Sequence, residues 1–247
     1  LNAITPAKIH QFQDELTGRE YANTTINTFG SILFQSMNDA HERGQLSVVP
    51  SRMKHLKAEN GRIRFFDANE EQSICTWFIS NGFEEYKDLT EFFIETGMRK
   101  IEVINLKWCD IDFKTKRITI WKPKNNFPRT ITMTPMVQAI LERWKLKKHN
   151  ITRFDDKIFG SINWENFSRV WRTMRAGLDQ AEDNQFVVHA LRHTCCTRLV
   201  SAGTDLRTVM EWMGHASLEI TQRYSHFVPQ RMDDAVGRLV SLRVNQP

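Results

Sequence analysis

The amino-acid sequence predicts a mainly α fold with a small antiparallel β-sheet, an α+β class, divided into two domains. Three observations lead to this prediction. Apolar residues recur at helical spacing over most of the 247 residues, two short segments of alternating β-forming residues flank a turn signal, and a basic, proline-containing run interrupts the helical pattern. The hydrophobic fraction of 40% is enough for a sizeable core.

Two helices are predicted at the start of the chain. Thr5 followed by Pro6 is a typical helix start, because a side-chain oxygen caps free amide groups and proline suits the first helical position. The apolar spacing then continues to a stop near Gly18. A second stripe begins near Asn23 and ends at Gly44. Two helices with one apolar face each make an incomplete bundle.

The domain boundary is predicted directly after these helices. Over residues 45–60 the apolar periodicity disappears, and basic residues accumulate around Pro50. We assign residues 1–50 to a helical domain, residues 51–64 to a basic interdomain linker and residues 65–247 to a larger second domain.

The second domain is predicted to combine one hairpin with many helices. A short strand is expected over residues 62–66, and Asp67 with Glu70 forms a capping box that starts the next helix. Residues 117–121 and 129–133 alternate β-forming residues around an Asn-Asn turn signal, which predicts a hairpin. The remaining helices are predicted near residues 84–96, 100–107, 135–147, 164–178, 189–202, 205–213, 218–224 and 231–242.

Composition gives weak indications of function. The net charge of +5 and the isoelectric point near 9.1 favour a polyanionic partner, although many proteins without such a partner are equally basic. Four cysteines, two of them adjacent and none in a CxxC pair, fit neither a disulfide framework nor a zinc knuckle. We therefore expect a reducing, intracellular setting, with no membrane span and no export signal.

The first of three candidate clusters lies at residues 96–102, where Gly97 ends one predicted helix and Arg99 opens the next. Such a turn can aim an arginine into a groove, and the guanidinium fork matches two phosphate oxygens. Taken alone, the pattern is better explained by a glycine cap and a solvated arginine that pairs with a nearby acid.

The second cluster opens the helix predicted from His189. The spacing places His189 and Arg192 on one face, so that an imidazole and a guanidinium can share one ligand. His189 and His193 also resemble a metal-binding pair, but the zincin glutamate and a third ligand are missing, and the adjacent arginine would repel a cation. We therefore expect no metal. Taken alone, the cluster would be explained by a helix cap at His189 and surface positions for Arg192 and His193.

The third cluster occupies residues 214–226. Gly214 ends one predicted helix, Ser217 can cap the next, and Tyr224 follows one to two turns later. The chain has only three tyrosines, so a nucleophilic tyrosine has few candidates. A single tyrosine in a helix is nevertheless more commonly a packing residue.

The order of these motifs is specific, although each motif alone is weak. The chain carries Gly-x-Arg, a hairpin lysine, His-x-x-Arg, and Gly-His followed nine residues later by tyrosine. On these residues it resembles the tyrosine recombinase family, the phage-type integrases, from about residue 5 to about residue 228. The two family boxes resemble residues 96–102 with 106–108, and residues 189–194 with 214–215 and Tyr224.

The resemblance implies a role for each matched residue. Arg99 and Arg192 match the arginine pair that holds the scissile phosphate and neutralises the added charge of the transition state. His189 and His215 match two histidine positions that bind phosphate oxygens or handle the tyrosine proton, and the sequence does not divide these two roles. Tyr224 matches the nucleophile.

The resemblance also implies a general acid for the departing 5′ oxygen, which is a lysine in the hairpin turn. Lys124 fits best because Arg129 follows in the returning strand, and Lys122 is the reserve candidate. Glu102 matches an acidic position that orients a neighbour. Contacts with DNA are expected from the basic residues Arg52, Lys54, Lys57, Arg62, Arg64 and Lys122.

The implied activity is site-specific cutting and rejoining of double-stranded DNA through a transient 3′-phosphotyrosine. This link keeps the energy of the phosphodiester, so no metal, ATP or other cofactor is expected. Residues 1–50 resemble part of a core-binding domain, with two of its usual four helices. The family further implies a homo-oligomer, a tetramer in the synaptic complex, with accessory DNA-bending proteins in the cytoplasm or nucleoid of a bacterial host.

Three other functions stay open at this point. A type IB topoisomerase-like enzyme would use similar chemistry, but the box spacing and the two-domain layout favour a recombinase. A decayed DNA-binding regulator should have lost some of the six proposed catalytic residues, and all are present. A metallohydrolase would rest on His189 and His193 alone. The sequence determines neither the target site nor whether the reaction is integration, excision, resolution or inversion.

Overall fold

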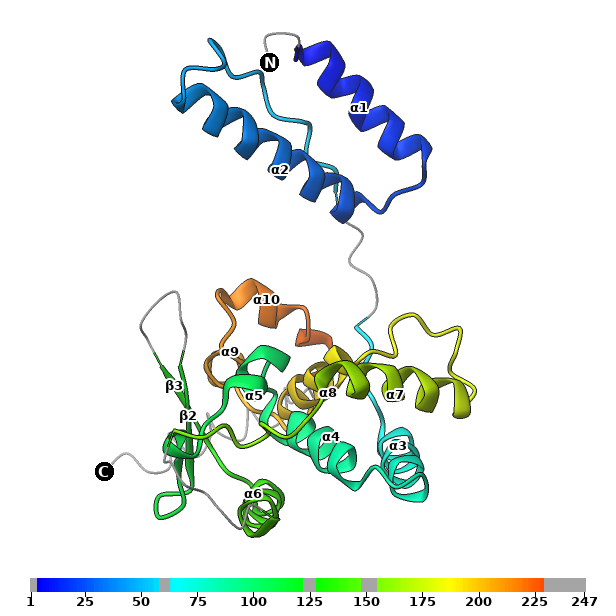
Figure 1. Ribbon diagram of the computed structural model, residues 1–247, viewed down its shortest axis with the longest axis vertical. Coiled ribbons are helices and arrows are strands. Elements are labelled where there is room, and N and C mark those ends of the chain that lie inside the picture. The colour runs from blue at the N-terminus through cyan, green and yellow to red at the C-terminus, as the bar shows by residue number, and fades with distance from the viewer. Residues whose placement is uncertain (1–3, 58–62, 122–127, 148–154, 229–247) are drawn as a thin grey trace, which may run out of the picture. The chain divides into compact units, whose positions relative to one another are not determined.

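The structure is a computed structural model that describes residues 4–57, 63–121, 128–147 and 155–228 (Figure 1). The chain divides into two compact units, Leu1–Arg62 and Ile63–Pro247. This division falls inside the segment expected to be a linker. The described residues are mostly helical and include a small antiparallel sheet, so the predicted fold class is confirmed. None of the described helices is long and apolar enough to cross a membrane.

The first unit contains α1 (Pro6–Gly18) and α2 (Asn23–Glu42), which pack against each other (Figure 1). The start of α1 is as predicted, because the Thr5 side chain accepts a hydrogen bond from the Lys8 amide and Pro6 occupies the first position. Ile9 and Met37 meet in the small core between the helices.

The described part of the expected linker is attached to this first unit. The Gln13 side chain donates to the Lys54 carbonyl over 2.7 Å, and the Asn27 side chain donates to the Leu56 carbonyl over 2.8 Å. The Arg52 guanidinium lies 4.1 Å from the centre of the Phe34 ring. Polar side chains of both helices therefore fix residues 52–57 along the helix pair.

The second unit is built around two central helices. α4 (Glu84–Thr96) packs on α8 (Val188–Ser201), and α4 also contacts α3 (Ala68–Ser80) and α6 (Pro135–Lys147) (Figure 1). The other described helical elements are α5 (Lys100–Asn105), η1 (Trp108–Asp110), α7 (Trp164–Gly177), α9 (Leu206–Met213), α10 (Leu218–Gln222) and η2 (Ser225–Phe227). Aromatic and branched side chains fill the core beside α4 and α8.

The sheet has three short antiparallel strands in the order β1-β2-β3. β2 (Arg117–Ile120) and β3 (Arg129–Thr132) form the predicted hairpin, and Ile118 pairs with Ile131 in its buried face. β1 (Ile111–Asp112) was not predicted, since two residues are too few to show an alternating pattern.

Two local predictions before α3 have different outcomes. The capping box is confirmed, because the Asp67 side chain accepts from the Glu70 amide and the Glu70 side chain accepts from the Asp67 amide. The predicted strand over residues 62–66 is wrong where the structure describes it, since 63–66 form no strand. The Phe66 amide donates instead to the Thr194 hydroxyl of α8 over 2.8 Å. The helix expected near residues 231–242 lies outside the described residues.

Candidate active site

Arg99 stands at the turn between α4 and α5. Gly97 ends α4 with a φ of 62°, and a β-carbon at this glycine would lie 2.7 Å from the Met213 sulfur, so both backbone conformation and space require glycine. The Arg99 guanidinium donates to Glu102 over 3.0 Å and to the Gly214 carbonyl over 2.8 Å. Its side chain remains 38% exposed, which leaves the guanidinium accessible to a ligand.

Arg192 is a buried cation on α8, with 4% of its surface exposed. Its guanidinium donates to the carbonyls of Gly97 and Met213. Burial, and then the charge of Arg99, lower its pKa to about 10, so the side chain is still a cation at neutral pH. The alternative that Arg192 is a surface group is therefore wrong. Both arginines bind carbonyls of the turn at Met213 and Gly214, and Arg192 also binds the Gly97 carbonyl.

Glu102 and Arg129 form a buried ion pair beside these arginines. Arg129 donates to the two Glu102 carboxylate oxygens over 2.8 and 2.7 Å, and to the Trp212 carbonyl over 2.9 Å. Although burial acts to raise the pKa of Glu102, the bonds and charges of Arg129 and Arg99 lower it to about 2. Arg129 thus ties β3 to the start of α5 and the end of α9.

The two histidines of the family pattern lie near the arginine pair. His215 follows Gly214, and its Nδ1 shares a hydrogen bond of 2.8 Å with the Thr221 hydroxyl. Burial, followed by the charges of Arg192 and Arg99, lowers the pKa of His215 to about 4. The same causes lower the pKa of His189. Both imidazoles are therefore neutral at pH 7, and each can donate one N–H to a phosphate oxygen.

Tyr224 follows α10 and is only 4% exposed. Its hydroxyl is hydrogen-bonded to Nδ1 of His193, and its ring stacks on His215 with an angle of 15° between the planes. Burial raises the pKa of the Tyr224 hydroxyl, while the charges of Arg192 and Arg223 act to lower it. The nucleophile expected from the sequence thus lies beside Arg192 and the histidines.

Comparison with known proteins agrees with this geometry. The model of the phage integrase family matches residues 64–231, which is most of the chain and includes every residue of the cluster. The chain belongs to the phage integrase family. The resemblance to the tyrosine recombinases is thereby confirmed, and with it the expected class of enzyme.

Individual relatives of this tyrosine recombinase cover nearly the whole chain. A tyrosine recombinase of Thermosipho africanus is 27% identical over 97% of this chain and 86% of its own length. The Tn1549 transposon integrase in complex with a circular intermediate DNA has a TM-score of 0.74 and 17% identity, covering 98% of this chain and 86% of that one. XerH bound to its difH substrate has a TM-score of 0.71 and 20% identity, and the match covers 96% of this chain and 72% of XerH.

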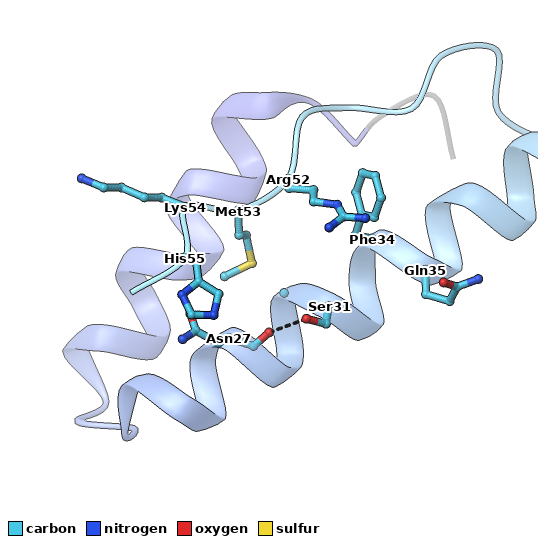
Figure 2. Close-up of a pocket in the computed structure, with 9 residues that line it drawn as sticks. Asn27, Ser31, Phe34, Gln35, Arg52, Met53, Lys54 and His55 are labelled. Carbon is cyan, nitrogen blue, oxygen red and sulfur yellow. Dashed lines mark hydrogen bonds between the residues drawn. The ribbon is translucent and has the colours of Figure 1, made fainter. Parts of the chain in front are cut away.

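The remaining expected site residues of the recombinase are placed as follows. Arg52, Lys54 and Lys57 are exposed in the first unit. Figure 2 shows Arg52 beside the Phe34 ring, at a cavity of about 270 Å³ that Lys54 also lines. The expected general acid Lys124, its reserve Lys122 and the expected DNA contact Arg62 lie outside the described residues.

Arg64 departs from the expected DNA-contacting role. Its guanidinium binds Glu70 over 2.5 Å and Asp183 over 2.8 Å, and it lies over the rings of Phe66 and Phe186. The hydrogen bond that Arg64 donates to Glu70 is the main cause that raises the pKa of Arg64. This arginine joins α3 to the loop before α8, so we assign it a structural role in place of a phosphate contact.

Two residues of the site were missed by the sequence analysis. His193 was considered as a metal ligand or a surface group, whereas it is the partner of the Tyr224 hydroxyl. Its position one turn after His189 on the same helix was the available signal. The sequence analysis used Arg129 only as the residue that follows Lys124 in the returning strand. No local sequence pattern indicates that it pairs with Glu102. Among the described residues, no three His, Cys, Asp or Glu side chains come together as metal ligands.

Proposed function

We propose that this chain is a site-specific recombinase that cuts and rejoins double-stranded DNA through a transient 3′-phosphotyrosine on Tyr224, without metal or ATP. One observation carries the proposal: Arg99 and Arg192 both bind carbonyls of the turn at Met213 and Gly214, and the buried Tyr224 lies beside Arg192. Two cations fixed at one turn, one of them beside the hydroxyl, suit the attack of that hydroxyl on a phosphodiester.

The arginines and histidines would divide the binding of the scissile phosphate. The guanidinium groups of Arg99 and Arg192 neutralise the charge that grows on the non-bridging oxygens. His189 and His215 are neutral and supply further N–H donors. Removal of one such donor typically costs ~10²- to 10³-fold in rate, so several are needed for an efficient reaction.

The leaving 5′ oxygen needs a proton, for which we propose Lys124, with Lys122 in reserve. The hairpin that carries them is anchored at Arg129, whose guanidinium is fixed by Glu102. Because Arg99 and Arg129 both bind Glu102, the start of β3 lies next to Arg99. This arrangement supports a lysine at the hairpin turn as the group that approaches the phosphate.

We further propose double-stranded DNA as the partner and a homo-oligomer, a tetramer, as the synaptic form, with accessory DNA-bending proteins. The Tn1549 integrase and XerH are described in complexes with DNA, which supports a duplex ligand. In the first unit, the exposed Arg52, Lys54 and Lys57 would contact phosphates. On this proposal residues 1–50 form a partial core-binding domain.

The proposal is tested with supercoiled plasmid in EDTA, stopped with denaturant, and scored for protein covalently attached to DNA. The wild type is expected to form adducts and relaxed plasmid, and Tyr224→Phe should form neither while still binding DNA. Adducts that persist in Tyr224→Phe would show another nucleophile. A wild type that binds plasmid without any adduct would favour a DNA-binding regulator.

A further inference from the structure

The hydroxyl of Tyr224 has a partner that is neither of the two histidines in the family pattern. Nδ1 of His193 is hydrogen-bonded to this hydroxyl. His193 projects from α8 next to Arg192, and its ring lies 6.0 Å from the Tyr224 ring, centre to centre. The ring of His189 stands perpendicular to that of His193, with 4.9 Å between the ring centres.

The other two histidines engage different groups. Nδ1 of His215 is occupied by the Thr221 hydroxyl, and its ring lies flat against the Tyr224 ring. His189 is exposed at the first turn of α8, where the charges of Arg192 and Arg99 act on it. Within the described hydrogen bonds, neither His189 nor His215 contacts the tyrosine hydroxyl. Both histidines are thus available to donate hydrogen bonds to the phosphate.

We propose that His193 positions the hydroxyl of Tyr224 and accepts its proton when the tyrosine attacks. This inference rests on the proposed function. In the step, the Tyr224 oxygen forms a bond to phosphorus, its proton moves to Nδ1 of His193, and the bond from phosphorus to the 5′ oxygen breaks. The 5′ oxygen takes a proton from the general acid. On rejoining, protonated His193 returns the proton to the departing tyrosine oxygen.

The surroundings of His193 suit a proton acceptor. Burial lowers its pKa to about 4, so the ring is neutral at pH 7. In the tautomer that carries its proton on Nε2, Nδ1 has a free electron pair for the tyrosine proton. A bound phosphate adds negative charge beside the arginines, which acts to raise the pKa of His193 when the substrate is in place. The titratable or charged groups that face His193 are His189 and Arg192 on its own helix, His215 before α10, and Arg223 and Tyr224 after it.

The thiol of Cys196 is the other group at the hydroxyl, and it cannot replace His193. Cys196 lies close enough to Tyr224 to influence its pKa. Burial raises the pKa of this thiol to about 12, so it keeps its own proton at neutral pH. A neutral thiol is a weak acceptor. The imidazole is therefore the only one of the two groups that can take up the tyrosine proton.

The test measures the initial rate of covalent adduct formation on supercoiled plasmid between pH 6 and pH 9. His193→Gln keeps a polar group near the hydroxyl but removes the proton acceptor. We expect a loss of about 10²- to 10⁴-fold at pH 7. The rate relative to wild type should rise by about tenfold per pH unit, because the tyrosine must then lose its proton to solvent. Using the ratio cancels the titration of the other groups.

Matched variants separate this role from general damage. His226→Gln changes an exposed histidine two residues after Tyr224, and it should leave the rate unchanged. His189→Gln should lower the rate by a factor that does not vary with pH. DNA binding and thermal unfolding are measured for every variant. A His193→Gln protein that binds DNA and keeps either the wild-type rate or a pH-independent ratio overturns the inference.

A second test uses the folded wild type and does not depend on a variant of His193. Nitrogen-detected NMR of the imidazoles should show His193 with its proton on Nε2 and none on Nδ1, and Tyr224→Phe should shift the Nδ1 signal. A proton on Nδ1 would overturn the inference. If the wild type forms no adducts at all, the proposed function itself fails, whereas wild-type adducts with an unaffected His193→Gln refute only the role of His193.

Discussion

Replacing Glu102 by glutamine should weaken the folded state in a pH-dependent way. The Glu102 carboxylate is 9% exposed and accepts two hydrogen bonds from Arg129, one from the Arg99 guanidinium and one from the Arg99 amide. Glu102→Gln keeps the shape of the side chain but removes its charge and turns an NH₂ group toward donors. Two arginines then lose their shared counter-charge.

The size of the effect follows from the pKa of Glu102, which is about 2 in the folded chain against an ordinary value of 4.5. This difference corresponds to ~3.4 kcal/mol of unfolding free energy at pH 7, similar to the ~3 to 5 kcal/mol for breaking a buried ion pair. Because the folded-state pKa is lowered, the contribution is complete well above pH 4.5 and is lost as the pH falls toward 2. At pH 3, ~1.4 kcal/mol remains.

Urea unfolding at pH 7 and pH 3 measures this contribution. All seven tryptophans lie in the second unit, so their fluorescence reports on the unit that contains Glu102. Glu102→Gln should lose about 3 kcal/mol at pH 7, and the difference from wild type should shrink by about 2 kcal/mol at pH 3. The exposed Glu182→Gln is the control. A loss below about 1 kcal/mol, or the same loss at both pH values, would refute the reasoning.

Two further substitutions test separate parts of the structure. Gly214→Ala should lower unfolding stability by at least ~1 to 2 kcal/mol, because φ is +63° and the added β-carbon would lie 2.8 Å from the Arg129 guanidinium. Gly18→Ala is the control and should not lower the stability in this way, because no atom lies within 4 Å of its added β-carbon. Equal losses of unfolding free energy in the two variants would contradict the argument. Lys54→Ala should reduce the slope of log DNA affinity against log salt concentration by about one phosphate contact. Lys145→Ala on α6 is the control and should leave this slope unchanged. An unchanged slope in Lys54→Ala, or an equal change in both variants, would show that Lys54 does not contact DNA.

The sequence predicted what depends on neighbours along the chain. The bounds of α4 and α6 agree with the predicted residues 84–96 and 135–147, because their stripes and caps are local signals. The strand over 62–66 failed, since its alternating apolar residues are also satisfied by packing on α8. Burial can be predicted from such a pattern, but the partner that provides it cannot.

The site shows the same division between local and distant information. Arg99, His189, Arg192, His215 and Tyr224 could be named because their motifs are short. The bonds that give them their environment join residues far apart in sequence. Arg129 is 27 positions from Glu102 and 83 from Trp212, and Tyr224 is 31 positions from His193. Only folding brings these pairs together, so spacing could mark His193 as a site candidate but could not pair it with Tyr224.

The two glycine turns explain how two arginine cations are tolerated beside a nucleophile. Gly97 ends α4 and Gly214 ends α9, and the last carbonyls of a helix lack partners within it. Arg192 donates to the Gly97 and Met213 carbonyls, and Arg99 donates to the Gly214 carbonyl. The negative end of α9 therefore stabilises both cations before any phosphate arrives, and the end of α4 stabilises Arg192 as well. Because the same guanidinium groups cap the helices and face the substrate site, their loss should cost stability as well as activity, whereas Tyr224→Phe leaves the bonds of both guanidinium groups in place.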